Sequence, residues 1–141
     1  MNKIYFSGLL FSVLLLSACS KDFLKSYDRR IVGVWRITDI NRTGLGGSTE
    51  NLPFQSGEFN FKDDGGLVYT DDAGTVYQGT WNIEKSYYNE TTQQSLNITV
   101  VNFTTQQVKG EYYDDINFTQ TDRFKARINQ GLHTYVTRFD R

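Results

Sequence analysis

The chain has 141 residues, the length of a single domain with a modest core. Its net charge of -1, with Lys and Arg scattered, argues against nucleic-acid binding, which needs a clustered basic surface. One cysteine excludes internal disulfides and cysteine-rich zinc sites. Aromatic residues are abundant (10 Phe, 9 Tyr and 2 Trp) and there is 1 Pro, a composition that favours strands.

Residues 1–18 have the pattern of a targeting segment. Lys3 supplies a positive start, and Ile4 to Leu16 form an apolar run that is short for a bilayer span. Small residues follow this run. The pattern predicts a cleaved signal peptide, with an uncleaved transmembrane anchor as the alternative.

The signal peptide ends in Leu16-Ser17-Ala18-Cys19, which resembles the lipobox of bacterial lipoproteins. Small residues before the cysteine suit a signal peptidase, and the thiol accepts a diacylglycerol. The resemblance implies that Cys19 becomes the lipidated first residue of a lipoprotein of the cell envelope. Two or three acyl chains, palmitate among them, would hold it at the membrane, whereas one chain alone binds reversibly. Ser20 in place of Asp favours the outer membrane, on either its periplasmic or its surface face.

Residues 19–30 are predicted to be the lipidated cysteine and a short charged tether. Phe23, Leu24 and Tyr27 have the spacing of one side of a short helix. The tether has no catalytic role in either conformation.

The first strand-like run opens with Gly33-Val34-Trp35, and Gly79-Thr80-Trp81 repeats the pattern near mid-chain. Gly and Trp two positions apart share one face of a strand, and the missing side chain leaves room for a neighbour against the indole. This pattern resembles the G-x-W signature at the start of lipocalin-like β-barrels. The resemblance implies a lipocalin-like domain over residues 31–141.

From Gly33 onward, alternation with a period of two predicts antiparallel strands punctuated by turns at Asp63 to Gly66 and Asp71 to Gly74. A long open loop is expected at 41–53 and a polar loop at 85–94, unless the tyrosines of the latter extend a hairpin. Eight strands with mostly short connections favour an up-and-down barrel, with a β-sandwich as the alternative. The predicted strands are 33–40, 57–62, 67–70, 75–84, 95–103, one within 106–120, 123–129 and 133–141.

Nine aromatic residues are predicted to point inward. They either line an apolar cup or fill the interior, because an eight-stranded barrel is only just wide enough for its own side chains or one small ligand. If there is a pocket, strand parity makes Tyr77, Trp81, Phe124 and Tyr135 its lining. The nine residues are Phe59, Phe61, Tyr69, Tyr77, Trp81, Phe118, Phe124, Tyr135 and Phe139.

No set of acid, base and nucleophile can be assembled from the sequence. His133 is the one histidine and is expected to be an exposed loop residue without a catalytic partner. The pairs Asp63-Asp64, Asp71-Asp72 and Asp114-Asp115 lack the spacing of a calcium loop, and two of them stand where turns favour Asp. We therefore expect no enzyme, no cofactor and no metal.

The last strand offers two arginines for a contact with Trp35. Arg141 continues the face of Tyr135, Thr137 and Phe139, whereas Arg138 lies on the other face. In lipocalin-like proteins a basic side chain near the end of the final strand commonly packs across the signature indole. The resemblance therefore implies that Arg141 stacks on Trp35; the alternative is that the terminal residue frays into solvent.

Two functions remain open at this point. The leading expectation is non-catalytic binding of a small apolar or amphipathic ligand inside the barrel. The alternative is an envelope accessory or protein-interaction module whose barrel is a filled scaffold. An empty apolar cavity favours the first function, and a filled interior favours the second.

Overall fold

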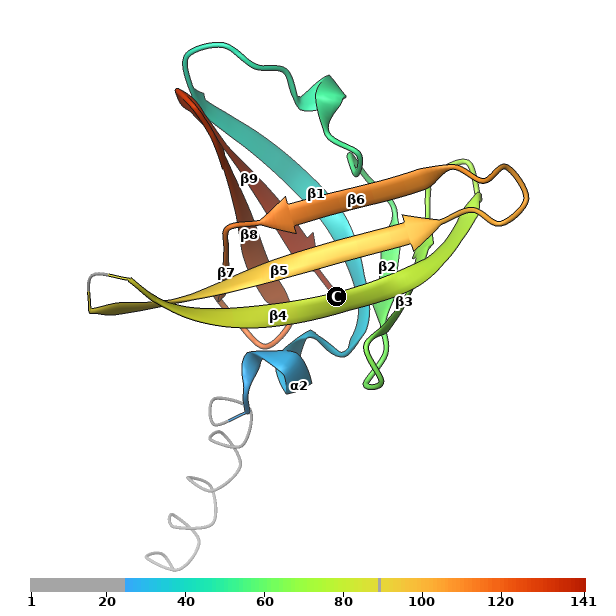
Figure 1. The fold of residues 1–141 in the computed structure, drawn as a ribbon, viewed down its shortest axis with the longest axis horizontal. Helices are drawn as coiled ribbons and strands as arrows, with labels where there is room; N and C mark the ends of the chain where they lie inside the picture. The colour runs from blue at the N-terminus through green and yellow to red at the C-terminus, as the bar shows by residue number, and fades with distance from the viewer. Residues whose placement is uncertain (1–24, 89) are drawn as a thin grey trace, which may run out of the picture.

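The computed structural model describes residues 25–88 and 90–141 (Figure 1). The predicted signal peptide, Cys19 and the tether up to residue 24 lie outside these residues. In the described part a short helix, α2 (Tyr27–Ile31), and a 3-10 turn, η1 (Thr49–Asn51), accompany nine strands. The strands are β1 (Gly33–Gly44), β2 (Glu58–Phe61), β3 (Gly66–Thr70), β4 (Val76–Tyr88), β5 (Thr91–Val101), β6 (Val108–Tyr113), β7 (Asp115–Phe118), β8 (Arg123–Gln130) and β9 (His133–Asp140).

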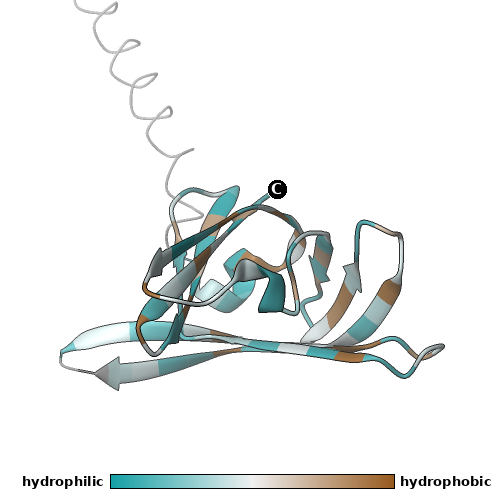
Figure 2. Cartoon of the chain, turned by 90° about the horizontal axis from the view of Figure 1, so that it is seen from above, coloured by the Kyte–Doolittle hydropathy of each residue, from teal (hydrophilic) through white to brown (hydrophobic). Residues whose placement is uncertain are grey.

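These nine strands form one antiparallel sheet in the order β6-β5-β4-β3-β2-β1-β9-β8-β7. The predicted all-β class is therefore confirmed. The prediction of eight strands closed into a barrel is corrected, because β6 and β7 end the sheet and are not paired with each other. The sheet bends so that the β4–β5 hairpin faces β8 and β9 across the core, which fits the sandwich-like alternative (Figures 1 and 2).

The strand expected within 106–120 is two strands joined by a single residue, Asp114. β6 pairs with β5, and β7 pairs with β8 at the other end of the sheet. The Asp114 carboxylate accepts a hydrogen bond of 2.6 Å from the Asn129 amide of β8. The chain thus crosses between the two ends of the sheet at Asp114, and this corner replaces the hydrogen-bonded closure of a barrel.

The segment 85–94, expected as a loop, belongs largely to a long β4–β5 hairpin. The ladder runs without a break from the Gln78–Val101 pair to the Tyr88–Thr91 pair. Tyr and Thr favour strands, whereas the polarity of this segment had suggested a loop. Lys85, Ser86 and Tyr87 are exposed, so this end of the hairpin is held by its backbone ladder and extends beyond the other strands (Figure 1).

The interior is filled with aromatic rings. All nine residues predicted to point inward are buried, so the predicted strand phase is confirmed. Phe124 stacks on Phe139 with ring centroids 4.4 Å apart, and Phe59 lies 4.7 Å from Tyr69. Such ring pairs stabilise a core beyond the area that they bury.

Both ends of the interior are closed by apolar side chains. At one end Ile31 of α2 is fully buried. At the other end Leu52 and Phe54 are buried, and the Phe54 ring lies 4.9 Å from that of Tyr69. The predicted open loop at 41–53 is corrected accordingly: β1 extends to Gly44, and the segment that follows turns inward because Leu52 and Phe54 are apolar.

Within the described residues, no helix is long and apolar enough to cross a membrane.

Candidate functional site

The end of the sheet that carries α2 is organised around Trp35. Its indole is fully buried, and its Nε1 donates a hydrogen bond of 2.6 Å to the Ile31 carbonyl at the end of α2. The indole also meets the Phe124 ring edge to face at 4.8 Å. Trp35 therefore ties the helix to the core by both a polar and an apolar contact.

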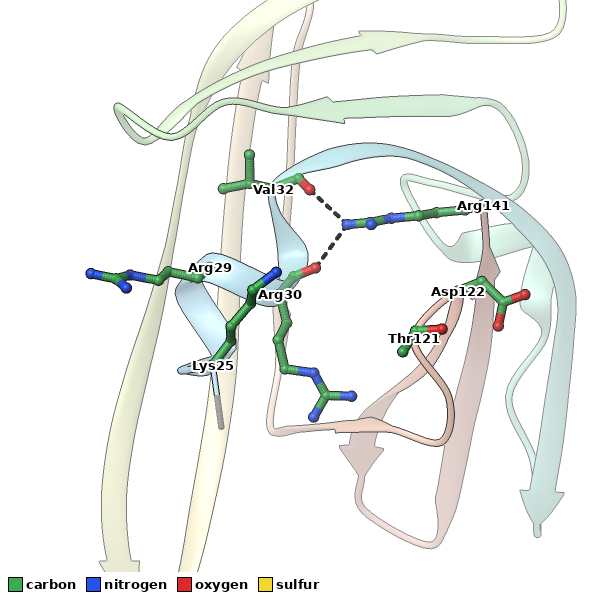
Figure 3. Close-up of a pocket in the computed structure, with 7 residues that line it drawn as sticks. All are labelled: Lys25, Arg29, Arg30, Val32, Thr121, Asp122 and Arg141. Carbon is green, nitrogen blue, oxygen red and sulfur yellow. Dashed lines mark hydrogen bonds between the residues drawn. The ribbon is translucent and has the colours of Figure 1, made fainter. Parts of the chain in front are cut away.

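Arg141 covers the outer side of this indole. Its guanidinium carbon lies 4.2 Å from the Trp35 ring centroid. Its Nη2 donates to the carbonyls of Arg30 at 2.8 Å and Val32 at 2.6 Å (Figure 3). The contact that strand alternation and the lipocalin-like resemblance implied is present in the structure.

Gly33 makes room for this arrangement. Its φ of +126° lies in a region that side-chain-bearing residues rarely adopt, and a Cβ there would lie 3.3 Å from the Arg141 Nη2. The neighbour for which the missing side chain leaves space is therefore the arginine.

The second Gly-x-Trp pair, Gly79 and Trp81, has a different structural role. A Cβ on Gly79 would lie 1.9 Å from the Thr99 carbonyl oxygen, so this glycine lets β4 and β5 approach closely. Trp81 is 8% exposed and donates from Nε1 to the Lys62 carbonyl at 3.0 Å. The repeat in sequence is thus not a repeat in structure.

Arg30 fastens α2 to the β7–β8 turn. Its guanidinium carbon lies 4.3 Å from the Phe118 ring centroid and 5.9 Å from that of Tyr27. Its Nη2 donates to the Gln120 carbonyl at 3.4 Å. The cation therefore has both an aromatic and a hydrogen-bonded contact on this side of the helix.

A cleft of about 420 Å³ opens between α2 and the β7–β8 turn. Figure 3 shows Arg141 reaching across it toward the helix, with Arg29 on the far side of α2 pointing away from Arg141. Four of the seven lining residues are basic and one is acidic. The lining residues are Lys25, Arg29, Arg30, Val32, Thr121, Asp122 and Arg141.

The chemistry of this basic cleft suits an anion. Guanidinium and ammonium groups keep their charge at neutral pH and donate charge-assisted hydrogen bonds to phosphate or carboxylate oxygens. Arg30 and Arg141 are held by aromatic and carbonyl contacts, which fix the position of their charges beside the cleft. Lys25 and Arg29 are exposed and widen the positive surface beyond them.

The four residues predicted as a ligand lining are all buried in the core. The Tyr77 hydroxyl donates to Gln107 Oε1 at 2.7 Å, and the Tyr135 hydroxyl donates to the Ser48 carbonyl at 3.2 Å. Phe124 and Trp81 pack in the core. Four further cavities of about 210 to 380 Å³ open on the described surface, and neither these nor the basic cleft is lined by any of the four.

His133 is not the exposed loop residue expected. It is half-buried at the start of β9, opposite Gly44 of β1, and its ring meets that of Tyr135 edge to face. β9 begins directly after the Gly131-Leu132 turn, which brings the imidazole into the ladder.

The acidic pairs in the two turns act locally on the backbone. Asp64 accepts from the Gly66 amide, and Asp71 accepts from the amides of Ala73 and Thr75. In the part of the chain that the structure describes, no group of three or more His, Cys, Asp and Glu is arranged to hold a metal ion.

The basic cleft was missed because its residues come from distant parts of the sequence. Lys25, Arg29 and Arg30 belong to the segment predicted as a charged tether, and Thr121 and Asp122 lie between two predicted strands. The available signal was the cluster of basic residues directly before Gly33, together with the expected return of Arg141 to Trp35.

Comparison with protein-family models, curated proteins and solved structures finds no match.

Proposed function

We propose that this chain is a lipid-anchored lipoprotein of a bacterial outer membrane whose β-domain is a non-catalytic interaction module. The observation that carries this choice over the binding of a small ligand inside the domain is the filled interior. Aromatic side chains occupy it, and Ile31 and Phe54 close its ends. The Gly33-Trp35-Arg141 contact supports kinship with lipocalin-like proteins, but here the interior is packed with side chains and the sheet is not closed into a barrel.

The anchor rests on Leu16-Ser17-Ala18-Cys19, and the basic cleft supplies a matching surface. Lys25 follows Cys19 by six positions, so a fully extended tether places the two about 20 Å apart at most. The end of the domain that carries α2 then faces the membrane. Each basic residue near an anionic surface contributes about 1 kcal/mol of attraction. We propose that the cleft contacts anionic headgroups of the anchoring bilayer.

Lipidation is tested by Cys19→Ala. The variant should lose incorporation of radiolabelled palmitate and remain unprocessed or soluble in the envelope, because the thiol that accepts the lipid is gone. Ser20→Ala is the matched control and should be labelled like the wild type. Equal labelling of Cys19→Ala would refute the anchor.

The cleft is tested with unlipidated protein on vesicles of phosphatidylcholine with and without phosphatidylglycerol. Lys25→Glu/Arg29→Glu should weaken binding to the anionic vesicles. Lys125→Glu/Arg127→Glu, the same charge change on exposed positions of β8, should not. Equal loss in both variants would mean that only net charge matters.

The choice between module and carrier is tested by native mass spectrometry of protein purified from its own cells. A filled interior predicts the mass of the lipidated chain alone. A retained apolar molecule would restore the ligand-binding function.

A further inference from the structure

β6 has no neighbouring strand on one side of its backbone among the described residues. It stands first in the sheet order, and among the described strands it pairs only with β5. The Asn102 amide donates to the Gln107 carbonyl where the two strands meet. Alternation of an antiparallel ladder then makes Lys109, Glu111 and Tyr113 the residues that bond to β5. The amides and carbonyls of the residues between them point to the open edge. On that side the Tyr112 amide donates to the carboxylate of Glu111 at 3.1 Å, and a strand added there replaces this local bond.

The side chains of this edge alternate as well. Val108 and Tyr112 are 62% and 49% exposed on the outer face, with Gly110 between them. Lys109 and Glu111 are half-buried on the inner face, where Lys109 Nζ lies 4.9 Å from the Tyr77 ring centroid. An edge strand with exposed apolar residues and a central glycine accepts a further strand closely.

A second copy of β6 fits this edge in one register. When two copies of β6 pair antiparallel about a two-fold axis, the amides and carbonyls of one open edge must face those of the other. This happens when the axis passes through a residue rather than between two residues. An axis at Lys109 sets Lys against Lys, and an axis at Glu111 sets Glu against Glu. An axis at Gly110 sets Lys109 of each copy against Glu111 of the other.

The same register pairs the remaining exposed residues. With the axis at Gly110, Val108 of each copy lies opposite Tyr112 of the other, and the two glycines meet at the centre. Opposite charges and apolar pairs directly across an antiparallel ladder are stabilising, and like charges are destabilising. The segment Val108-Lys109-Gly110-Glu111-Tyr112 is therefore self-complementary.

We propose that the chain forms a two-fold dimer by antiparallel pairing of the β6 edges, centred on Gly110. A lysine on an edge strand ordinarily discourages strand addition, because a foreign strand leaves it without a counter-charge. Here Glu111 of the second copy supplies that charge, so the edge favours pairing with a second copy of the same strand. The dimer does not depend on the lipid anchor.

The test exchanges the two charges and uses the full chain in detergent solution, with the association state measured by sedimentation equilibrium. Lys109→Glu and Glu111→Lys should each weaken the dimer about tenfold or more, because each sets like charges opposite one another twice. Lys109→Glu/Glu111→Lys should restore it. An equimolar mixture of the two single variants should also form dimers, since each then carries the charge that the other needs.

Gly110→Pro is an independent arm without any charge change. It removes an amide that faces away from β5, so the fold should persist by circular dichroism while the dimer is lost. A monomeric wild type overturns the proposal, including the case in which a strand of another protein occupies the edge. Dimers that are indifferent to both single charge changes and to Gly110→Pro also overturn it, because they must use another surface.

Discussion

At the scale of single residues, Arg141 connects the two ends of the described chain. It stacks on the indole of the first strand and binds two carbonyls beside α2, so the last strand, the first strand and the helix meet at one side chain. Gly33 permits this contact because it lacks a Cβ and adopts a positive φ.

Arg141→Ala should lower the melting temperature and shift the Trp35 fluorescence. The cation–π contact contributes on the order of 0.5–2 kcal/mol, and the loss of the guanidinium also exposes the indole to water. Arg138→Ala, on the opposite face of β9, is the control and should leave the emission unchanged. Identical melting and emission in Arg141→Ala would mean that apolar packing alone holds Trp35.

Tyr69 should make stability depend on alkaline pH. Burial, with a smaller contribution from Asp71 and Asp72, raises its pKa from 10.0 to about 12. Between these two values the unfolded chain ionises while the folded chain stays protonated, so its contribution is complete below pH 10 and disappears as pH rises through about 12. The burial of Tyr113 raises its pKa in the same direction.

This dependence is measured as the urea midpoint across that pH range. Tyr69→Phe should flatten the decrease, because no hydroxyl remains to ionise. Tyr112→Phe, an exposed position on β6, should decrease like the wild type. A Tyr69→Phe curve that parallels the wild type would show that other groups control alkaline unfolding.

At the scale of elements, the corner at Asp114 decides the architecture. The residues before and after Asp114 are both in extended strands, β6 and β7, but these two strands lie at opposite ends of the sheet. One carboxylate, bound to the backbone of β8, holds this change of direction.

Asp114→Ala should therefore lower the free energy of unfolding by about 1.5–3 kcal/mol, the range for a hydrogen bond to a charged group. It should also accelerate hydrogen exchange at the Asn129 amide. Asp114→Asn keeps an acceptor oxygen and should lie between alanine and the wild type. Unchanged exchange at Asn129 in the alanine variant would indicate that the ladder alone fixes the corner.

At the scale of the whole molecule, the packing of the interior distinguishes an interaction module from a domain that binds a small ligand inside. Trp81 is the test residue, because strand parity places it inward in either case. In a filled core Trp81→Ala should lower the free energy of unfolding by about 3–5 kcal/mol, as measured by urea titration. Trp81→Phe should cost less because it keeps most of the ring. A small loss in Trp81→Ala would indicate that the indole borders a wet pocket.

The local alternation of side chains was readable from the sequence. Phe59 and Phe61, or Leu96, Ile98 and Val100, are inward because every second residue of a strand shares a face. The same rule separated Arg141 from Arg138 as the arginine for the contact with Trp35 that the lipocalin-like resemblance implied. The turns at Asp63 to Gly66 and Asp71 to Gly74 followed from the backbone conformations that Asp and Gly tolerate.

Pairing between distant strands was decided only in the tertiary structure. Tyr113 and Ile116 are both buried although they are three positions apart, so the period of two is interrupted between them. Such an interruption does not tell which strands the segments before and after it pair with. Three further features depend on contacts between segments far apart in the chain. They are the open ends of the sheet at β6 and β7, the filling of the interior's ends by Ile31 and Phe54, and the position of Arg29 and Arg30 beside the β7–β8 turn. Periodicity is a local property of the sequence, whereas these features depend on how the sheet bends.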